Sequence, residues 1–124
     1  MREIKFDAIY KPTGEHFTPW KIDFINNHVT GTFDGVEGDW CIFSIDGNRG
    51  DAILRQYTGL KDKNGVEIYE GDVADCLAIG YAVVLFKAGC FGIKNKAQGF
   101  FPFYELGGKV EIIGNIYENP ELMT

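Results

Sequence analysis

The side chains that could perform nucleophilic catalysis are few in this chain. Its only histidines are His16 and His28, and its thiols are Cys41, Cys76 and Cys90. A catalytic Cys or Ser needs an adjacent base, and neither imidazole lies in a recognisable motif. His28 and Cys41 could meet across a hairpin, but a small core thiol beside a surface imidazole is the better interpretation. We therefore expect no catalytic residues and a protein that is not an enzyme.

Metal and cofactor sites are equally poorly supported. The two His and three Cys are spread along the chain without the close ligand pairs that zinc sites use. Five acidic residues fall in predicted loops but do not fit the spacing of a calcium loop: Asp34, Glu37, Asp39, Asp46 and Asp51. Four more are divided between the two faces of strands and do not form acid–base pairs: Glu67, Glu70, Asp72 and Asp75. We expect no metal and no cofactor.

Short strands are the elements that would position these groups. Ile4, Phe6, Ala8 and Tyr10 alternate with polar residues, which predicts a strand with one solvated face. The same alternation is repeated after Pro19 by three large apolar residues: Trp20, Ile22 and Phe24. Residues 29–33 and 40–45 predict a further hairpin around a glycine-rich loop.

The second half of the chain continues this pattern. Residues 73–77, 81–87, 91–94, 100–104 and 110–117 are short apolar runs separated by glycine-containing turns. Sixteen glycines and the absence of a sustained helical period predict little helix. Residues 46–51 contain turn formers and no large apolar residue, so we expect a boundary there. It would divide the chain into an N-terminal part (residues 1–50) and a second part (residues 51–124). The chain is also short enough for the two parts to form one compact domain.

Residues 54–73 carry the most specific pattern in the chain. An extended piece ending at Tyr57 meets a break at Gly59, and a polar turn over residues 61–65 leads into a second strand. This block resembles the YopX family of small proteins carried by bacteriophages and by prophages of Gram-positive bacteria. Residues 1–6, 84–93 and 112–122 are similar to the same family, whereas residues 9–53 match none of its patterns.

The resemblance implies a fold and a phage or prophage setting, with no catalytic residues to transfer. We expect five residues of this half to form structural turns: Gly59, Gly65, Gly71, Asp72 and Gly114. Asp72 should accept hydrogen bonds from backbone amides at the Gly71 corner. The overall expectation is a mainly β protein in which an N-terminal antiparallel part packs on a small SH3-like β-barrel.

Charge and composition restrict the partners. The formal net charge of −6 disfavours direct binding to nucleic acid or to an anionic membrane. The N-terminus lacks the pattern of a signal peptide and the odd number of cysteines argues against a disulfide framework, so we expect a cytoplasmic protein in a bacterial host cell.

Aromatic residues are the best candidates for a binding surface, because a small β fold cannot cover every ring. The candidates in the family-like half are Tyr57, Tyr69, Phe100, Phe101, Phe103 and Tyr104. We expect a non-enzymatic phage accessory protein that binds or assembles with a protein partner or a second copy of itself. The alternative is an acidic decoy that inhibits a host defence nuclease or another nucleic-acid-binding enzyme.

Overall fold

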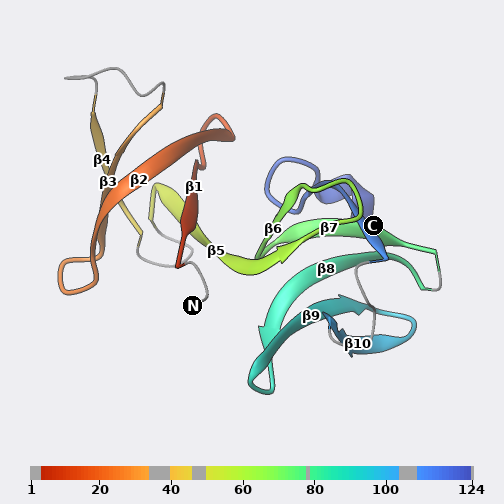
Figure 1. Ribbon diagram of the computed structural model, residues 1–124. Coiled ribbons are helices and arrows are strands. Elements are labelled where there is room, and N and C mark those ends of the chain that lie inside the picture. The colour runs from red at the N-terminus through yellow and green to blue at the C-terminus, as the bar shows by residue number, and fades with distance from the viewer. Residues whose placement is uncertain (1–3, 34–39, 46–49, 78, 104–108, 124) are drawn as a thin grey trace. The chain divides into compact units, whose positions relative to one another are not determined.

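The computed structural model of the protein describes residues 4–33, 40–45, 50–77, 79–103 and 109–123. In chain order its elements are β1 (Phe6–Tyr10), β2 (Glu15–Asp23), β3 (His28–Thr32), β4 (Cys41–Ser44), β5 (Ala52–Lys61), β6 (Glu67–Tyr69), β7 (Asp72–Cys76), β8 (Gly80–Lys87), β9 (Cys90–Asn95), β10 (Gly99–Pro102), β11 (Val110–Asn115) and the 3-10 helix η2 (Pro120–Met123), as Figure 1 shows. The predicted mainly β fold with little helix is confirmed. Within these residues no helix is both long and apolar enough to cross a membrane.

Antiparallel pairing arranges the strands in two sheets. One has the order β4-β3-β2-β1-β5-β6 and the other the order β10-β9-β8-β7-β11. The chain divides into two compact units, which we call the N-terminal unit (Lys5–Gln56) and the C-terminal unit (Tyr57–Thr124, together with Ile4). β5 contributes to both, because its part up to Gln56 pairs with β1 and its part from Tyr57 onward pairs with β6.

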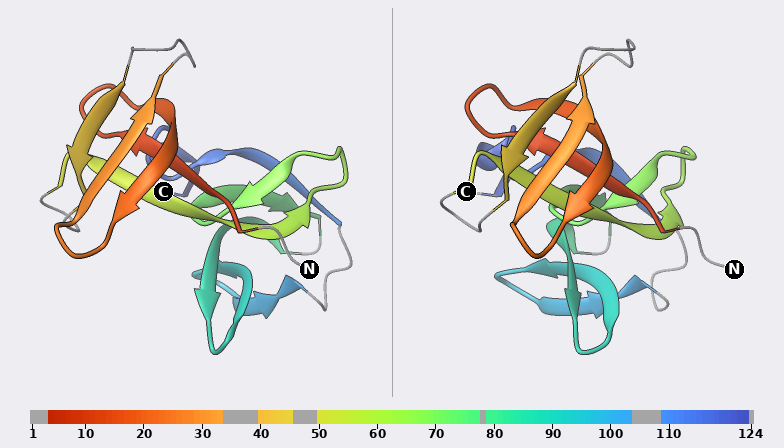
Figure 2. Two further views of the ribbon diagram at one scale, coloured as in Figure 1. Left: turned by 60° about the vertical axis from the view of Figure 1, so that its left-hand side comes forward. Right: turned by 90° about the vertical axis from the view of Figure 1, so that its left-hand side faces the viewer.

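The core of the N-terminal unit lies on one face of its sheet, in which β2 pairs with β3 and β3 with β4; these strands lie side by side in Figure 2. The fully buried core residues are Ala8, Phe17, Val29 and Ala52. Tyr10 and Phe43 pack against them as a stacked pair with ring centroids 4.4 Å apart. The predicted hairpin between residues 29–33 and 40–45 is confirmed by the pairing of β3 with β4.

A β-bulge interrupts the alternation predicted for β2. The register with β3 shifts between Pro19 and Lys21, so Trp20 is an extra residue on the β2 side. A one-residue shift moves the following side chains to the opposite face of a strand. Consequently Ile22 packs against the core while Trp20 is exposed, and Phe24 is exposed in the turn that follows the end of β2. The prediction that these three residues share one face is therefore wrong.

The C-terminal unit contains the predicted hairpin framework. Its first strand is bulged between Tyr57 and Lys61, where Gly59 has a φ of 86°. The core of the unit contains apolar side chains from β6 to β9, Phe103 and β11: Ile68, Ala74, Cys76, Ala82, Val84, Phe91, Ile93, Phe103 and Val110. The helix η2 contacts β8.

The five-stranded sheet of this unit is open. Among the described residues, its end strands β10 and β11 pair only with β9 and β7 respectively. We expected a small SH3-like β-barrel in residues 51–124, but the sheet is not closed, because no pairing among the described residues joins β10 to β11.

Candidate functional site

The aromatic residues predicted to form a binding surface are largely used for packing within the C-terminal unit. Tyr57 is 5% exposed and its ring lies 5.5 Å from that of half-buried Tyr69. Phe103 is buried in the core and Phe101 packs against it. Phe100 is half-buried, with Lys87 Nζ 5.9 Å from its ring centroid. Tyr104 lies outside the described residues.

The predicted turn residues occupy corners of the backbone. Three of them have positive φ angles, which glycine adopts without strain: Gly59, Gly65 and Gly71. As predicted, Asp72 accepts a backbone hydrogen bond, from Tyr69 N to its Oδ2 at 2.9 Å. Gly114 follows a register shift between β11 and β7, and a Cβ there would meet the side chain of Asn119.

Asp62, which the sequence shows only as part of a polar turn, holds this turn together. Its Oδ1 accepts hydrogen bonds from Asn64 N at 2.8 Å and Val66 N at 2.9 Å. Its Oδ2 accepts one from Ile112 N on β11 at 2.9 Å. Burial raises the pKa of Asp62, but the amides of Ile112, Val66 and Asn64, with the nearby charge of Lys63, outweigh burial and hold the pKa below its ordinary value. The residue is 6% exposed, and its hydrogen bonds join the turn to β11.

A second polar cluster joins three strands of the N-terminal unit. Asp7 Oδ2 on β1 accepts hydrogen bonds from Arg55 Nη2 at 2.7 Å and Nε at 3.2 Å on β5. His16 Nδ1 on β2 lies 2.8 Å from the same oxygen. Arg55 is 4% exposed, so the carboxylate balances a buried guanidinium, and the cluster is explained by that pairing.

The strand register separates His28 from Cys41. The register places His28 opposite Ser44, while Cys41 lies opposite Gly31 and donates through its Sγ to Gly31 O at 3.4 Å. The structure therefore does not bring this imidazole and this thiol together. In the part of the chain that is described, no group of three or more His, Cys, Asp and Glu side chains is arranged to hold a metal ion.

The acidic residues required by the decoy hypothesis are mostly outside the described residues: Asp34, Glu37, Asp39 and Asp46. Of the others, Asp51 is exposed in the N-terminal unit, and Glu67 and Glu70 are half-buried in the C-terminal unit. The decoy hypothesis therefore stays a prediction.

An exposed apolar surface of the N-terminal unit was not predicted from the sequence. Trp20 is 60% exposed, Trp40 is 61% exposed and Ile42 is 51% exposed. We call these three residues the tryptophan face. Two further exposed apolar residues, Phe24 and Ile25, lie in the turn between β2 and β3.

Strand register places the tryptophan face on the outer side of the sheet. Thr30 on β3 lies between Lys21 on β2 and Ile42 on β4 in the paired rows. Trp40 precedes Ile42 by two residues, which puts both on the same side, and the bulge places Trp20 beside Lys21. Thr30 is only 8% exposed, so larger neighbours cover it. Trp20, Trp40 and Ile42 are thus placed on one side of the sheet, around the row formed by Lys21, Thr30 and Ile42.

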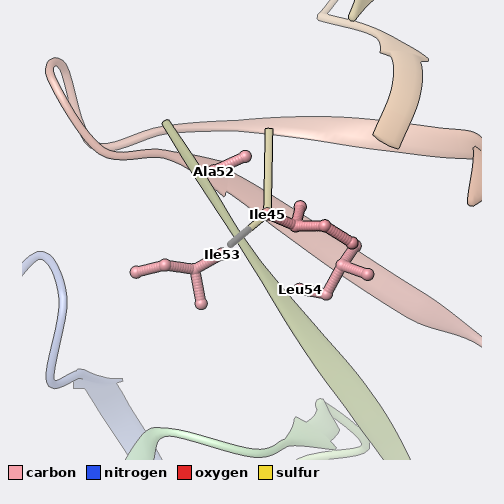
Figure 3. Close-up of a pocket in the computed structure, with 4 residues that line it drawn as sticks. All are labelled: Ile45, Ala52, Ile53 and Leu54. Carbon is pink, nitrogen blue, oxygen red and sulfur yellow. The ribbon is translucent and has the colours of Figure 1, made fainter. Parts of the chain in front are cut away.

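A small apolar pocket lies elsewhere in the same unit. It has a volume of about 220 Å³ and is lined by Ile45, Ala52, Ile53 and Leu54. Figure 3 shows Ile53 on the opposite side of β5 from Leu54. None of these four described residues carries a polar or ionisable side chain.

A sequence model of a known family, described as YopX protein, matches residues 17–124. The chain belongs to the YopX family. This confirms the predicted family. The YopX match also includes residues 17–53, so the prediction that residues 9–53 match none of its patterns is wrong for most of that stretch, and residues 1–6 lie outside the match. The whole tryptophan face lies inside it.

Two solved structures are similar to this YopX-family chain. Protein EF1440 from Enterococcus faecalis is 28% identical, with a TM-score of 0.67 and with 100% of each chain covered. Protein yopX from Bacillus subtilis is 16% identical, with a TM-score of 0.54, 100% of this chain covered and 98% of that one. No curated protein matches the chain. These likenesses identify the YopX fold and name no reaction.

Proposed function

We propose that this YopX-family protein is a non-enzymatic binding module that presents the tryptophan face to another macromolecule. The observation that carries this proposal is the exposure of both tryptophans of the chain on one side of a paired sheet. Exposed apolar side chains of this kind, here with the polar residue Lys21 beside Trp20, are typical of protein interaction sites.

The energetics favour such a role. A Trp side chain presents about 150–250 Å² of surface, and more than half of it is exposed at Trp20 and Trp40. Burial at about 25 cal/mol per Å² would then contribute about 2–4 kcal/mol for each ring before the costs of association. Trp residues at the centre of an interface are frequently the ones whose loss most weakens binding.

The remaining polar clusters support a binding role over a catalytic one. The carboxylate beside His16 is committed to buried Arg55, and Asp62 is committed to backbone amides. Each cluster is explained by stabilisation of the fold. We propose that the protein acts in the cytoplasm of a bacterial host as a phage or prophage accessory protein, a setting that rests on its family resemblance.

Affinity capture from a host lysate tests this function when face variants are compared with a matched control. The full chain, a Trp40→Ser variant and a Leu77→Ser control would each be immobilised and their captured proteins identified by mass spectrometry. Leu77 is 95% exposed and belongs to the C-terminal unit, so it controls for loss of an exposed apolar side chain. We expect a partner that is retained by wild type and by the control and lost with Trp40→Ser. Equal recovery with all three proteins would contradict the proposed site.

A further inference from the structure

We infer that the free edge of β5 binds an extended segment of a partner protein by strand addition, with one large apolar side chain of that segment in the pocket of Figure 3. The residues that line this pocket are not those of the tryptophan face, so the inference goes beyond the proposed function and does not depend on it. In strand addition the backbone of an incoming peptide continues a sheet, and pockets beside the edge select its side chains.

The pocket lies at the edge of β5. Three consecutive residues of the strand line it: Ala52, Ile53 and Leu54. Neighbouring side chains of a strand point to opposite faces, and Figure 3 shows Ile53 on the opposite side of β5 from Leu54. A pocket that touches both faces of one strand adjoins an edge of that strand. Because β1 pairs along the other edge, the pocket adjoins the edge that β1 leaves free.

Backbone groups at this edge are directed away from β1. Lys11 N donates a hydrogen bond to Asp51 O at 2.9 Å, and the register with β1 continues without a shift from Ala52 to Gln56. Hydrogen-bonded and non-hydrogen-bonded pairs alternate along antiparallel strands. The N–H and C=O groups of Ala52 and Leu54 therefore point to the free edge. Among the described residues, no strand other than β1 pairs with this part of β5.

The walls of the pocket are fixed by the core of the N-terminal unit. Ala52 belongs to that core, and Ile45 and Leu54 pack against it. Asp51 N donates a hydrogen bond to Ser44 Oγ at 3.1 Å, which joins the end of β4 to the start of β5. A preformed pocket of this kind lowers the cost of association, because little has to be ordered when a side chain enters.

The combination of pocket and edge selects an extended peptide over a free small molecule. The pocket volume of about 220 Å³ is below the roughly 300–1,000 Å³ of sites for drug-sized ligands. The four lining side chains are all apolar, so polar recognition at this site depends on the backbone of the edge. A peptide supplies backbone donors and acceptors together with an apolar side chain, whereas a free apolar molecule would leave the edge unpaired.

Net charge selects among extended peptides. The formal charge of the chain is −6, so a basic segment is attracted and an acidic one is repelled. We therefore expect Lys or Arg residues on either side of the apolar residue. Binding of such a segment should weaken as salt is raised, because salt screens the attraction.

A set of short peptides tests the site on the full chain. Each peptide has Lys and Thr residues around one central residue, which is Leu, Phe, Ala or Glu, and binding is followed by fluorescence anisotropy. We expect the Leu and Phe peptides to bind at least about tenfold more tightly than the Ala peptide, and the Glu peptide not to bind. Amide hydrogen exchange at Leu54 should slow on binding, because its N–H gains an acceptor.

Backbone methylation of the Leu peptide tests the strand pairing itself. An added strand directs every second N–H toward its neighbour. Methylation of one alternate set of peptide nitrogens should therefore abolish binding, and methylation of the other set should leave it intact. A peptide that only inserts its side chain would respond equally to both sets.

Two substitutions of the same type separate this site from the tryptophan face. Ile53→Thr should raise the dissociation constant of the Leu peptide about fivefold, because it removes apolar contact from the pocket. Ile53→Val should give a smaller increase. Ile42→Thr is the matched control on β4 and should leave the dissociation constant unchanged. Circular dichroism of each variant checks that the sheet is intact.

Three outcomes would overturn the inference. The first is that none of the peptides binds, or that binding leaves hydrogen exchange at Leu54 unchanged. The second is an equal response to both sets of methylated nitrogens, which indicates a side chain held without strand pairing. The third is binding that is lost with Ile42→Thr and kept with Ile53→Thr, which would place the peptide on the tryptophan face. The proposed function fails separately, when Trp40→Ser captures the same lysate proteins as wild type.

Discussion

Replacing Asp62 by Ala should lower the free energy of unfolding by about 3 kcal/mol, because three backbone amides lose their acceptor at once. Each hydrogen bond to a charged acceptor contributes about 1.5–3 kcal/mol when its donor is left unsatisfied. Asn64 and Val66 are exposed, so water can replace the carboxylate at their amides. The amide of Ile112 belongs to a half-buried strand residue and carries most of the loss.

Asp62→Asn is the sharper substitution because it keeps the size of the side chain. Its oxygen can accept from Asn64 and Val66, but its NH₂ group then faces the N–H of Ile112, where two donors oppose each other. We expect a loss of about 1–2 kcal/mol at neutral pH. Asp75→Asn is the matched control in the same unit, because its carboxylate receives no hydrogen bond from the described residues.

The Asp62 effect should depend on pH in a defined direction. The folded pKa of Asp62 is lowered, so the folded protein binds this proton less tightly than the unfolded chain does. The stability that Asp62 contributes is therefore complete above its unfolded pKa of about 3.9, and it is lost as the pH falls through the lower folded pKa. The difference between wild type and Asp62→Asn should be largest near neutral pH and should shrink below about pH 4.

Urea unfolding followed by far-ultraviolet circular dichroism between neutral and acidic pH measures this difference. Tryptophan fluorescence, which reports only on the N-terminal unit, would show whether the loss reaches beyond the C-terminal unit that contains Asp62. A difference that stays constant across the pH range, or an Asp62→Asn midpoint equal to that of Asp75→Asn, would refute the reasoning.

Further stability predictions follow from the close contacts and the ion pair. Gly31→Ala should lower the free energy of unfolding by about 3 kcal/mol, because the new Cβ would collide with the backbone oxygen of Thr18. Gly65 has a φ of 83° and open space around it, so Gly65→Ala should lower the free energy of unfolding by only about 1 kcal/mol. Chemical denaturation that ranks the two variants in the opposite order would contradict this. Asp7→Ala should be more damaging than His16→Ala in thermal unfolding, by about 2 kcal/mol, because it removes a partner of buried Arg55 while the His16 side chain is 41% exposed. Ile93→Ala should lower the free energy by about 3–4 kcal/mol through a core cavity, with Ile93→Val near 1 kcal/mol, and equal losses would show that the site collapses.

Much of the fold follows from local sequence signals. The hairpins of the C-terminal unit are specified by Gly59, Gly65 and Gly71 between apolar runs, and all three have the positive φ that such corners require. The turn at Asp62 was visible in the sequence as a polar segment. Its link to Ile112, 50 residues away, was not, because no local pattern encodes which distant amide a carboxylate will meet.

The candidate site could not be predicted for a similar reason. A single extra residue at Trp20 changed which side chains of β2 face the solvent, and alternation alone does not reveal a bulge. Tyr57 and Phe103 are as aromatic as Trp20, yet they are buried because other strands of their unit cover them. Exposure is decided by tertiary packing, so composition indicated the class of residue and not its location.

The strand β5 limits how the two units can be exchanged among relatives. It is one strand from Ala52 to Lys61, and its first part pairs with β1 while its last part pairs with β6. Because side chains alternate along a strand, inserting or deleting a single residue near Gln56 would reverse every subsequent side chain relative to its partners. Chimaeras joined at this point should therefore fold only when the junction adds or removes an even number of residues, so that the side chains on both sides of it keep their faces of the sheet.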